Sequence, residues 1–352
     1  MIISAKGNLI EAGAEALVNT VNCEGFMGKG IALQFKKAFP ENFKAYEHAC
    51  RHGDVRPGKV FIYSTGSLMN PKYIINFPTK RNWRENSRLE YIESGLKSLT
   101  EEMRRLAISS VAVPPLGCGL GGLKWVDVRP MIESAFKELP DVRVMLFEPA
   151  GAPAAKDMPV NTVRPKLTLA RALFIKLIHQ YAEMSYRLTL LEIQKLAYFL
   201  QEAGEPLKLK YVAHIYGPYA HNLNKVLEIL EGHYTRGYGD SQKPDVEIEL
   251  LPGAVDEADK FLTESKDSVT RLNNVAGLIN GFETPYGLEL LASVHWVAKF
   301  SVPPATNTEE AVQSIHNWSE RKCKMFKAEH IRTAWNRLKE QGWLANGQYL
   351  QD

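Results

Sequence analysis

The first 150 residues of this 352-residue chain alternate short apolar runs with helix-like segments, and this alternation constrains the fold most. Arg88–Leu106 has the clearest helical period, because its apolar residues recur at spacings of three or four. Strands that alternate with helices predict an α/β domain, with a largely parallel or mixed sheet covered by helices. The expected strands are Ala16–Val21, Lys59–Ser64, Lys72–Phe77, Ser110–Pro114 and Val142–Phe147, and the other expected helices are Gly30–Phe39, Glu41–His52 and Val126–Leu139.

A stretch with three prolines separates this region from a second one of different composition. Ala150–Lys166 has many small residues and no apolar periodicity, which predicts a linker or an extended arm. We therefore expect a first domain over residues 1–152, a linker over 153–166, and a mainly α-helical (α+β) domain over 167–352. The clearest strand of this second domain is Val246–Leu251. Its expected helices are Leu167–Glu183, Leu188–Glu202, Asn222–Glu231, Val255–Leu262, Val269–Leu278, Tyr286–Val297 and Ala328–Gln341.

Composition excludes several classes of protein. The net charge is only +3, so any contact with nucleic acid has to come from a local patch. The four cysteines lie far apart without a C-x-x-C pair, which argues against a zinc site and against a disulfide framework. The chain shows neither a signal peptide nor an apolar run of the ~20 residues that span a bilayer. We expect a cytoplasmic protein that needs no metal and no cofactor.

Two glycine-rich loops follow strands at the edge where α/β sheets usually bind ligands. The first loop lies in VNTVNCEGFMGKGIALQFKK (Val18–Lys37), where the helix from Gly30 presents free N–H groups that favour phosphate. The second lies in VPPLGCGLGGLKW (Val113–Trp125), where four glycines in Gly117–Gly122 can wrap a diphosphate. Neither a dinucleotide fingerprint nor a P-loop is present. Each loop can also be a plain turn.

A third loop carries a lysine directly after a strand. In IINFPTKRNWRENSR (Ile74–Arg88), Lys80 follows the strand end and is itself followed by Arg81, Arg84 and Arg88. An unselected lysine in such a loop is usually a solvated charge, but the carboxyl end of a strand is where sites lie on such folds. Near the start of the chain, Gly7-Asn8-Leu9 offers a polar side chain and a backbone N–H that can read the edge of an adenine.

Together these segments resemble the macrodomain superfamily over about 150 residues. Within it, the motifs M-G-K-G-I-A-x-x-F-K-K, N-F-P-T-K and G-C-G-L-x-x-L-x-W are similar to the branch that contains the terminal ADP-ribose glycohydrolase and the DarG antitoxins. N-F-P-T-K and the unusual second half point to the DarG antitoxins. The resemblance implies a three-layer α/β/α macrodomain with a mixed sheet, followed by the helical second domain.

The resemblance also implies an ADP-ribose pocket with a catalytic lysine, which is Lys80 here. Asn8 and Leu9 would lie at the adenine, Asn22 and Gly28–Gly30 at the distal ribose, and Gly117–Gly122 around the diphosphate. The full set of ADP-ribose residues that it implies is Asn8, Leu9, Thr20, Asn22, Gly28, Lys29, Gly30, Ile31, Thr79, Gly117, Cys118, Gly119, Leu120, Gly121 and Gly122. Arg81, Trp83 and Arg84 are expected to contact DNA, although Trp83 can equally be a packing residue.

Two positions depart from the pattern of the superfamily. Most macrodomains have aspartate where Asn8 stands, so adenine selectivity can differ. The terminal ADP-ribose glycohydrolase has aspartate in its G-C-G-L-D loop where this chain has Gly121, so an acid that would act with the lysine is missing. We expect the missing side chain to free space for a bulkier leaving group.

The resemblance implies hydrolysis of the N-glycosidic bond between ADP-ribose and a thymidine or guanosine of single-stranded DNA. The transition state would have oxocarbenium character. Lys80 can attack C1″ as a neutral amine, or it can stabilise or protonate the departing base as an ammonium. Attack by a water positioned by Asn22 is a further possibility. The alternatives are a module that binds ADP-ribose without cleaving it and a hydrolase of protein-linked ADP-ribose.

Leu190–Leu230 resembles the toxin-neutralising domain of the DarG antitoxins, which implies that the second domain binds the ADP-ribosyltransferase toxin DarT. Its histidines, His214, His221 and His233, are expected to be structural or exposed, because no carboxylate or cysteine is spaced with them. An acidic run, Asp245–Glu264, holds seven acids against one base and can be a solvated face or a mimic of DNA charge. A winged-helix DNA binder is the alternative, supported by Lys208, Lys210 and Lys225.

Overall fold

The computed structural model describes residues 1–149, 158–182, 188–239 and 247–344, and the chain forms two compact units. The first unit is Met1–Arg164 together with Gly239, and the second holds the other described residues from Pro165 onward. Asn161 lies beyond the expected end of the first domain, yet its backbone N–H and its side-chain Nδ2 donate to the carbonyls of Lys37 and Ala38. Among the described residues, no helix is both long and apolar enough to cross a membrane.

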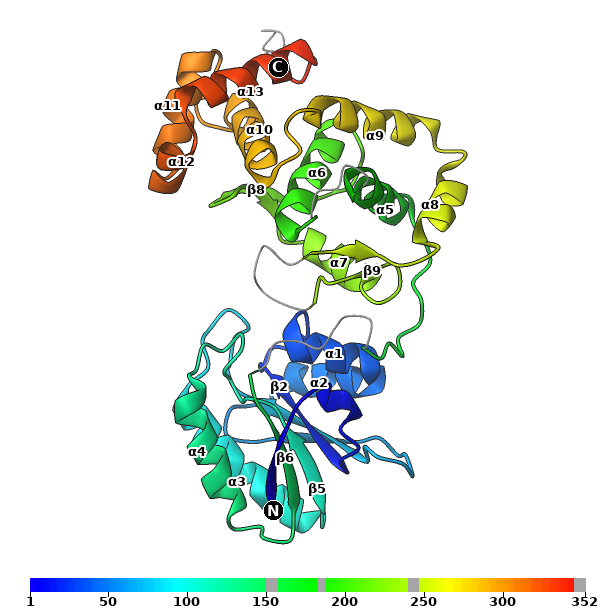
Figure 1. The fold of residues 1–352 in the computed structure, drawn as a ribbon, viewed down its shortest axis with the longest axis vertical. Helices are drawn as coiled ribbons and strands as arrows, with labels where there is room; N and C mark the ends of the chain where they lie inside the picture. The colour runs from blue at the N-terminus through cyan, green and yellow to red at the C-terminus, as the bar shows by residue number, and fades with distance from the viewer. Residues whose placement is uncertain (150–157, 183–187, 240–246, 345–352) are drawn as a thin grey trace. The chain divides into compact units, whose positions relative to one another are not determined.

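The first unit is built on a six-stranded mixed sheet in the order β1-β6-β5-β2-β4-β3 (Figure 1). All neighbouring strands are parallel except β3, which runs antiparallel to β4 at one edge. This confirms the mixed sheet, and the expected strands match to within a few residues at their ends. The strands are β1 (Ile2–Ala5), β2 (Ala16–Val21), β3 (Phe61–Ser64), β4 (Tyr73–Pro78), β5 (Ser110–Val113) and β6 (Arg143–Phe147).

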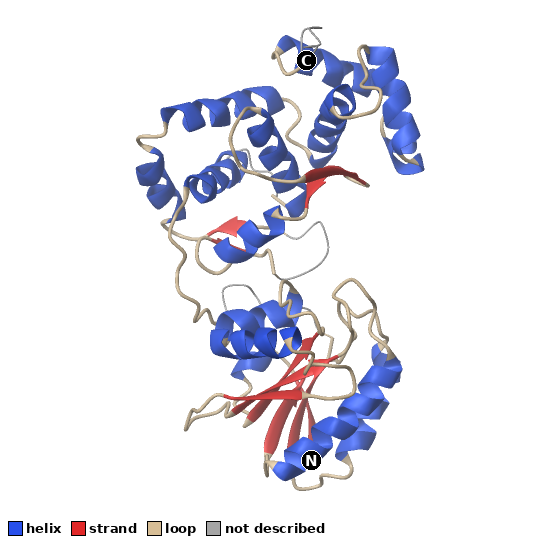
Figure 2. Cartoon of the chain, turned by 180° about the vertical axis from the view of Figure 1, so that it is seen from behind, coloured by secondary structure: helices blue, strands red, loops and turns tan. Residues whose placement is uncertain are grey.

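Helices cover both faces of this sheet, as the alternation of strands and helices predicts (Figure 2). The apolar stripes of α3 (Leu89–Arg105) and α4 (Trp125–Phe136) pack on one face, in a core that includes Val18 and Ile75. The other face receives η1 (Leu9–Glu11) and α1 (Gly30–Ala38) in a second core, and α2 (Pro40–Arg51) packs beside α1. Successive strand residues point to opposite faces, which confirms the three-layer α/β/α architecture.

A buried group of asparagine side chains ties β2 to its neighbour β4. Asn19 and Asn76 face each other in the strand register, and the Nδ2 of Asn19 donates to the Oδ1 of Asn76 at 3.0 Å. The Nδ2 of Asn76 donates to the Oδ1 of Asn42 on α2 at 2.7 Å. All three residues are fully buried. This network fixes the relative position of the two strand ends that carry Asn22 and Lys80.

The second unit is mainly helical and contains two small antiparallel strand pairs, β7–β8 and β9–β10. Its strands are β7 (Tyr211–His214), β8 (Gly217–Ala220), β9 (Thr235–Arg236) and β10 (Glu249–Leu250). Its helices are α5 (Leu169–Ala182), α6 (Leu190–Glu202), α7 (Leu223–Leu230), α8 (Ala254–Leu262), α9 (Lys266–Ile279), α10 (Pro285–Lys299), α11 (Thr308–Trp318), α12 (Glu320–Met325) and α13 (Ala328–Glu340).

Two features of the second unit differ from the expectation. The strand expected over Val246–Leu251 is regular only over β10, and its first residue, Val246, lies outside the described residues. Helices α11 and α12 are absent from the expected set. Both are capped by side chains, because the Asn307 Oδ1 accepts from the backbone N–H of Glu309 and the Ser319 Oγ from that of Lys322.

Candidate functional site

The three loops singled out in the sequence leave the sheet from adjacent strands. β2 pairs in parallel with β4 on one side and with β5 on the other. Residues that follow these three strands therefore begin at the same edge of the sheet. The structure brings together the first loop (residues 22–29), the third loop (79–88) and the second loop (114–124) at this edge.

The side chain of Asn22 holds the first loop in shape. Its Oδ1 accepts from the backbone N–H of Glu24 at 2.8 Å, and its Nδ2 donates to the carbonyl of Phe26 at 2.6 Å. The Tyr46 hydroxyl donates to the backbone carbonyl of Asn22 at 2.8 Å. Asn22 is nearly buried, at 6% exposure. An amide nitrogen carries two hydrogens, and the acceptor found among the described residues, the Phe26 carbonyl, engages one of them.

The first loop meets the second loop where α1 begins. Gly30 has a φ of +59°, and a Cβ at this position would lie 3.2 Å from the Cδ1 of Leu120. Glycine is therefore suited to this position both by its backbone angle and by the close approach of the second loop. Burial lowers the pKa of the neighbouring Lys29 ammonium below its ordinary value.

Lys80 connects the third loop to the second. Its half-buried Nζ donates to the backbone carbonyl of Trp83 and to that of Leu120, each at 3.2 Å. Burial lowers the pKa of Lys80 below its ordinary value, while the negative charge of Glu85 acts in the opposite direction. An ammonium has three N–H donors, and the acceptors found among the described residues engage two of them.

The second loop presents a row of backbone N–H groups. Its shape comes from the hydrogen bonds of the Cys118 N–H to the Pro115 carbonyl and of the Leu123 N–H to the Gly117 carbonyl. In the part of the chain that the structure describes, the N–H groups of the successive residues 119, 120 and 121 donate to no acceptor. Successive unpaired N–H groups in a turn form an anion-binding concavity, which suits a diphosphate.

Comparisons with known proteins decide the family. The Macro domain family matches residues 18–132. A DNA ADP-ribosyl glycohydrolase from Thermus aquaticus is 46% identical, and the match covers 98% of this chain and 94% of that relative. The chain belongs to the DNA ADP-ribosyl glycohydrolase family.

Two further relatives of this glycohydrolase family match parts of the chain. The solved macrodomain of Mycobacterium tuberculosis DarG is 57% identical, over 43% of this chain and 99% of that chain, with a TM-score of 0.42. A DNA ADP-ribosyl transferase–DNA ADP-ribosyl glycohydrolase fusion protein from Thermosipho africanus is 32% identical, over 47% of this chain and 45% of the relative.

The two residues expected at the adenine, Asn8 and Leu9, also have structural roles in the first unit. Asn8 caps η1, because its Oδ1 accepts from the backbone N–H of Ile10 at 3.1 Å. The Leu9 side chain is buried in the core beside α1, so only its backbone can face a ligand. Thr20 and Thr79 lie at the ends of β2 and β4, and Thr79 is buried with its N–H bonded to the Val21 carbonyl.

Ile31 and Cys118 are expected ligand contacts whose side chains also belong to the cores. Ile31 packs against the core beneath α1, and Cys118 against the core beneath α3 and α4. Burial raises the pKa of the Cys118 thiol to about 11, so this thiol is neutral at physiological pH. In the ranges that the structure describes, no three His, Cys, Asp or Glu side chains are arranged to hold a metal ion.

The residues expected to contact DNA lie on the exposed side of the third loop. Trp83 is 40% exposed, and the Arg84 guanidinium lies 4.7 Å from the centre of its ring. Arg81 and Arg88 lie 6.0 and 5.7 Å from the ring of Tyr91, at the start of α3. Tyr91 is a candidate that sequence reasoning missed, because it reads as one more residue of an amphipathic helix.

The expectation that Gly121 frees space was wrong. A Cβ at position 121 would lie 2.1 Å from the Oγ of Ser87 and 2.5 Å from the Gly117 carbonyl oxygen. The backbone N–H of Ser87 also donates to the Gly121 carbonyl at 2.8 Å. The space that an aspartate side chain would need is therefore filled by the third loop, and position 121 accepts only glycine in this arrangement.

This steric contact predicts the effect of a single methyl group. We expect Gly121→Ala to destabilise the chain by about 1–3 kcal/mol, because overpacked positions force neighbouring atoms to move. It is also expected to weaken ADP-ribose binding, since the loop must shift. Gly119→Ala is the control for stability, because a Cβ there meets no atom within 4 Å. Thermal unfolding and titration calorimetry with ADP-ribose measure both effects, and equal melting temperatures for the two variants would contradict the packing argument.

Proposed function

We propose that this chain hydrolyses the N-glycosidic bond between C1″ of ADP-ribose and a thymidine or guanosine base of single-stranded DNA. In this reaction the bond from C1″ to the base breaks, a water oxygen binds C1″, and the base nitrogen regains a proton. The observation that carries the proposal is the position of Lys80, whose ammonium bridges to the loop with the unpaired N–H groups. The family of the chain supports the same reaction.

We assign Lys80 the role of an ammonium that acts on the departing base. Both of its partners, the Trp83 and Leu120 carbonyls, are acceptors, and hydrogen bonds to a charged form favour that form. The leaving base gains negative charge as its bond to C1″ breaks, so the third N–H of Lys80 can stabilise or protonate it. No carboxylate occurs in residues 117–122 to share this task.

The other loops would hold the rest of the substrate. The unpaired N–H groups of residues 119–121 suit the diphosphate, and the second N–H of the Asn22 amide would orient the attacking water. Exposed Arg81 and Arg84 would contact DNA phosphates, and Trp83 offers a ring for stacking on an unpaired base. Stacking of this kind requires a base outside a duplex, which favours single-stranded DNA.

The direct test of this function is the Lys80→Ala variant on single-stranded oligonucleotides ADP-ribosylated at thymidine or at guanosine. We expect release of ADP-ribose to fall by about 100-fold or more, which is the usual contribution of such a group. Binding of free ADP-ribose should change little, because the diphosphate is held by backbone groups. Lys97→Ala is the matched control, since Lys97 is an exposed lysine on α3.

The outcomes of this experiment separate the proposed reaction from its alternatives. Undiminished release by the Lys80→Ala variant would remove Lys80 from the mechanism. Tight binding of ADP-ribose by the unmodified chain without any release would identify a binding module. Release from ADP-ribosylated protein, but not from DNA, would identify a hydrolase of protein-linked ADP-ribose.

We also propose that the second unit binds and inhibits the ADP-ribosyltransferase toxin DarT. A transferase and a glycohydrolase share one chain in the relative from Thermosipho africanus, which supports a physical association of the two activities. The acidic run offers a surface for such a partner. Glu249 on β10 and Asp256 on α8 are exposed, whereas Asp259 pairs with Lys176 at 2.9 Å. Asp245 lies outside the described residues.

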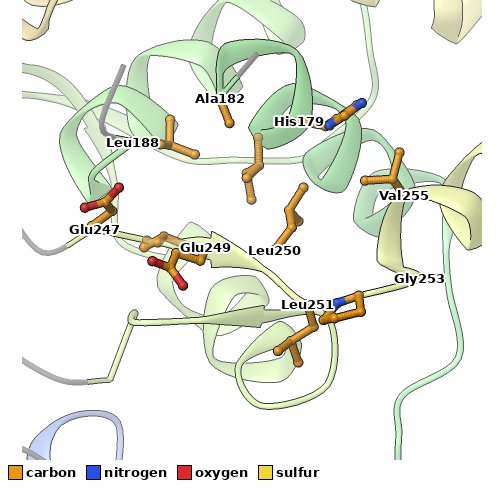
Figure 3. A pocket seen from close by; sticks show the side chains of 12 residues that line it. His179, Ala182, Leu188, Glu247, Glu249, Leu250, Leu251, Gly253 and Val255 are labelled. Atoms are coloured by element: carbon orange, nitrogen blue, oxygen red, sulfur yellow. The ribbon is translucent and has the colours of Figure 1, made fainter. Parts of the chain in front are cut away.

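This acidic surface borders a hollow of 420 Å³ (Figure 3). The carboxylates of Glu247 and Glu249 lie together on one side of the hollow, and the side chains of Leu250 and Val255 contribute an apolar lining. Two carboxylates beside an apolar hollow are complementary to basic residues such as those that line a DNA-binding groove.

Charge reversal at this surface tests the toxin contact. We expect Glu249→Lys combined with Asp256→Lys to weaken binding of the toxin by tenfold or more and to reduce the salt dependence of the affinity, because exposed charges act over about 10 Å at 0.1 M salt. The control reverses two exposed acids of α12 and α13, Glu320 and Glu340. Equal affinities for the two double variants, measured by calorimetry, would show that the toxin docks elsewhere.

A further inference from the structure

The carboxylate of Glu24 bridges the first loop to the third. One oxygen, Oε1, accepts from the Nδ2 of Asn82 at 3.0 Å, and the other, Oε2, accepts from the backbone N–H of Trp83 at 3.1 Å. The backbone N–H of Glu24 is itself held by the Oδ1 of Asn22 at 2.8 Å. Neither the motifs nor the family resemblance points to Glu24. Its side chain is exposed, so burial also fails to single it out.

A short chain of hydrogen bonds leads from Glu24 to the lysine. The Glu24 carboxylate accepts a hydrogen bond from the backbone N–H of Trp83. The backbone carbonyl of Trp83 accepts in turn from the Lys80 Nζ at 3.2 Å. At its other end, Glu24 is fixed to Asn22, in the loop assigned to the distal ribose. The position of the ammonium relative to the ribose therefore depends on how this carboxylate holds the Asn82–Trp83 segment.

The bridge requires two acceptor atoms on one side chain. Both partners of Glu24, the Asn82 amide and the Trp83 N–H, are donors, and an ionised carboxylate offers two acceptor oxygens. A glutamine has the same shape but only one acceptor, so it would turn its NH₂ group toward one of these donors. The Oδ1 of Asn82 accepts from the backbone N–H of Arg84 at 2.8 Å, which prevents a simple flip of the Asn82 amide.

We propose that Glu24 is a positioning residue for the hydrolysis proposed above: its carboxylate sets the distance and direction of the Lys80 ammonium relative to the distal ribose. This inference rests on the proposed function of the site. Misplacement of a catalytic group by about 1 Å can cost as much as 100-fold in rate without loss of folding. Hydrogen bonds of an exposed carboxylate contribute little to stability, so the rate and the stability should respond differently.

The test is a cycle of four proteins that exchanges the donor and the acceptor of one hydrogen bond. Glu24→Gln is expected to lower the single-turnover rate of ADP-ribose release from the modified oligonucleotide by about tenfold or more. Asn82→Asp, which places two carboxylates face to face, should lower it at least as much. In the combined Glu24→Gln/Asn82→Asp variant one bond reverses its direction: the amide nitrogen at position 24 donates to the carboxylate at position 82, while the amide oxygen at position 24 still accepts from the Trp83 N–H. The second carboxylate oxygen at position 82 can still accept from the Arg84 N–H. We expect its rate to return to within about threefold of wild type.

A second carboxylate, Glu85 in the third loop, separates geometry from charge. Glu85 is exposed, and among the described residues its side chain makes no hydrogen bond to either neighbouring loop. Glu85→Gln removes the same charge without removing a bridge. Its expected effect is a shift of the alkaline limb of the pH profile to lower pH, because Glu85 raises the pKa of Lys80. Glu24→Gln should instead lower the rate at every pH, with ADP-ribose affinity and melting temperature close to wild type.

The rates of these variants either support the positioning role of Glu24 or overturn it. Rescue by the double variant, together with a smaller loss for Glu85→Gln than for Glu24→Gln, supports a positioning role. The double variant restores the hydrogen bonds and the net charge together, so Glu85→Gln is the variant that separates the two. An unchanged rate for Glu24→Gln, or equal losses for Glu24→Gln and Glu85→Gln, would overturn the inference while the proposed hydrolysis stands. A wild-type chain that releases no ADP-ribose overturns the proposed function and this inference with it.

Discussion

Two hydrogen bonds of the Lys80 ammonium hold the candidate site together. The Trp83 carbonyl lies in the same loop as the lysine, and the Leu120 carbonyl lies in the loop that presents the unpaired N–H groups. A lysine bonded in this way is a fixed positive charge at the junction of two loops rather than a mobile side chain. Burial lowers the pKa of Lys80, while hydrogen bonds to the two carbonyl oxygens favour its charged form.

The sheet beneath the loops supplies the rigid frame that this junction needs. The parallel pairing of β5, β2 and β4 brings three loop starts to one edge, and the buried amides of Asn19 and Asn76 fix β2 against β4. Hydrogen bonds also join the loops to one another. Glu24 of the first loop accepts from the third loop, and the Ser87 N–H of the third loop donates to the second. Because residues 117–122 hold no carboxylate that could act with Lys80, the proposed reaction depends on this geometry, and positioning has to supply what a second group would otherwise contribute.

Much of this could be predicted from the sequence, since strands and amphipathic helices leave a periodic pattern and the strand ends define where a site lies. The strand ends predict that Lys80 and the glycine loop lie near each other, and the structure brings them together. The expectation of free space at Gly121 was wrong, because the Ser87 side chain that fills this space comes from a loop more than 30 residues earlier. The Glu24 bridge leaves no periodic trace for the same reason. Nor does the sequence indicate that hydrogen bonds of the Asn22 side chain shape its own loop.

The pH dependence of a single turnover tests the central claim that Lys80 acts as an ammonium. The rate of ADP-ribose release from a modified single-stranded oligonucleotide is measured with excess enzyme, from neutral pH to about 10. The protonated lysine is the active form in this account, so the rate should fall as pH rises through a pKa that lies below the ordinary value for lysine. The fall should be absent from the residual rate of Lys80→Ala. A rate that rises through the same pH range would contradict the account, because it would show that the neutral amine is the reacting species.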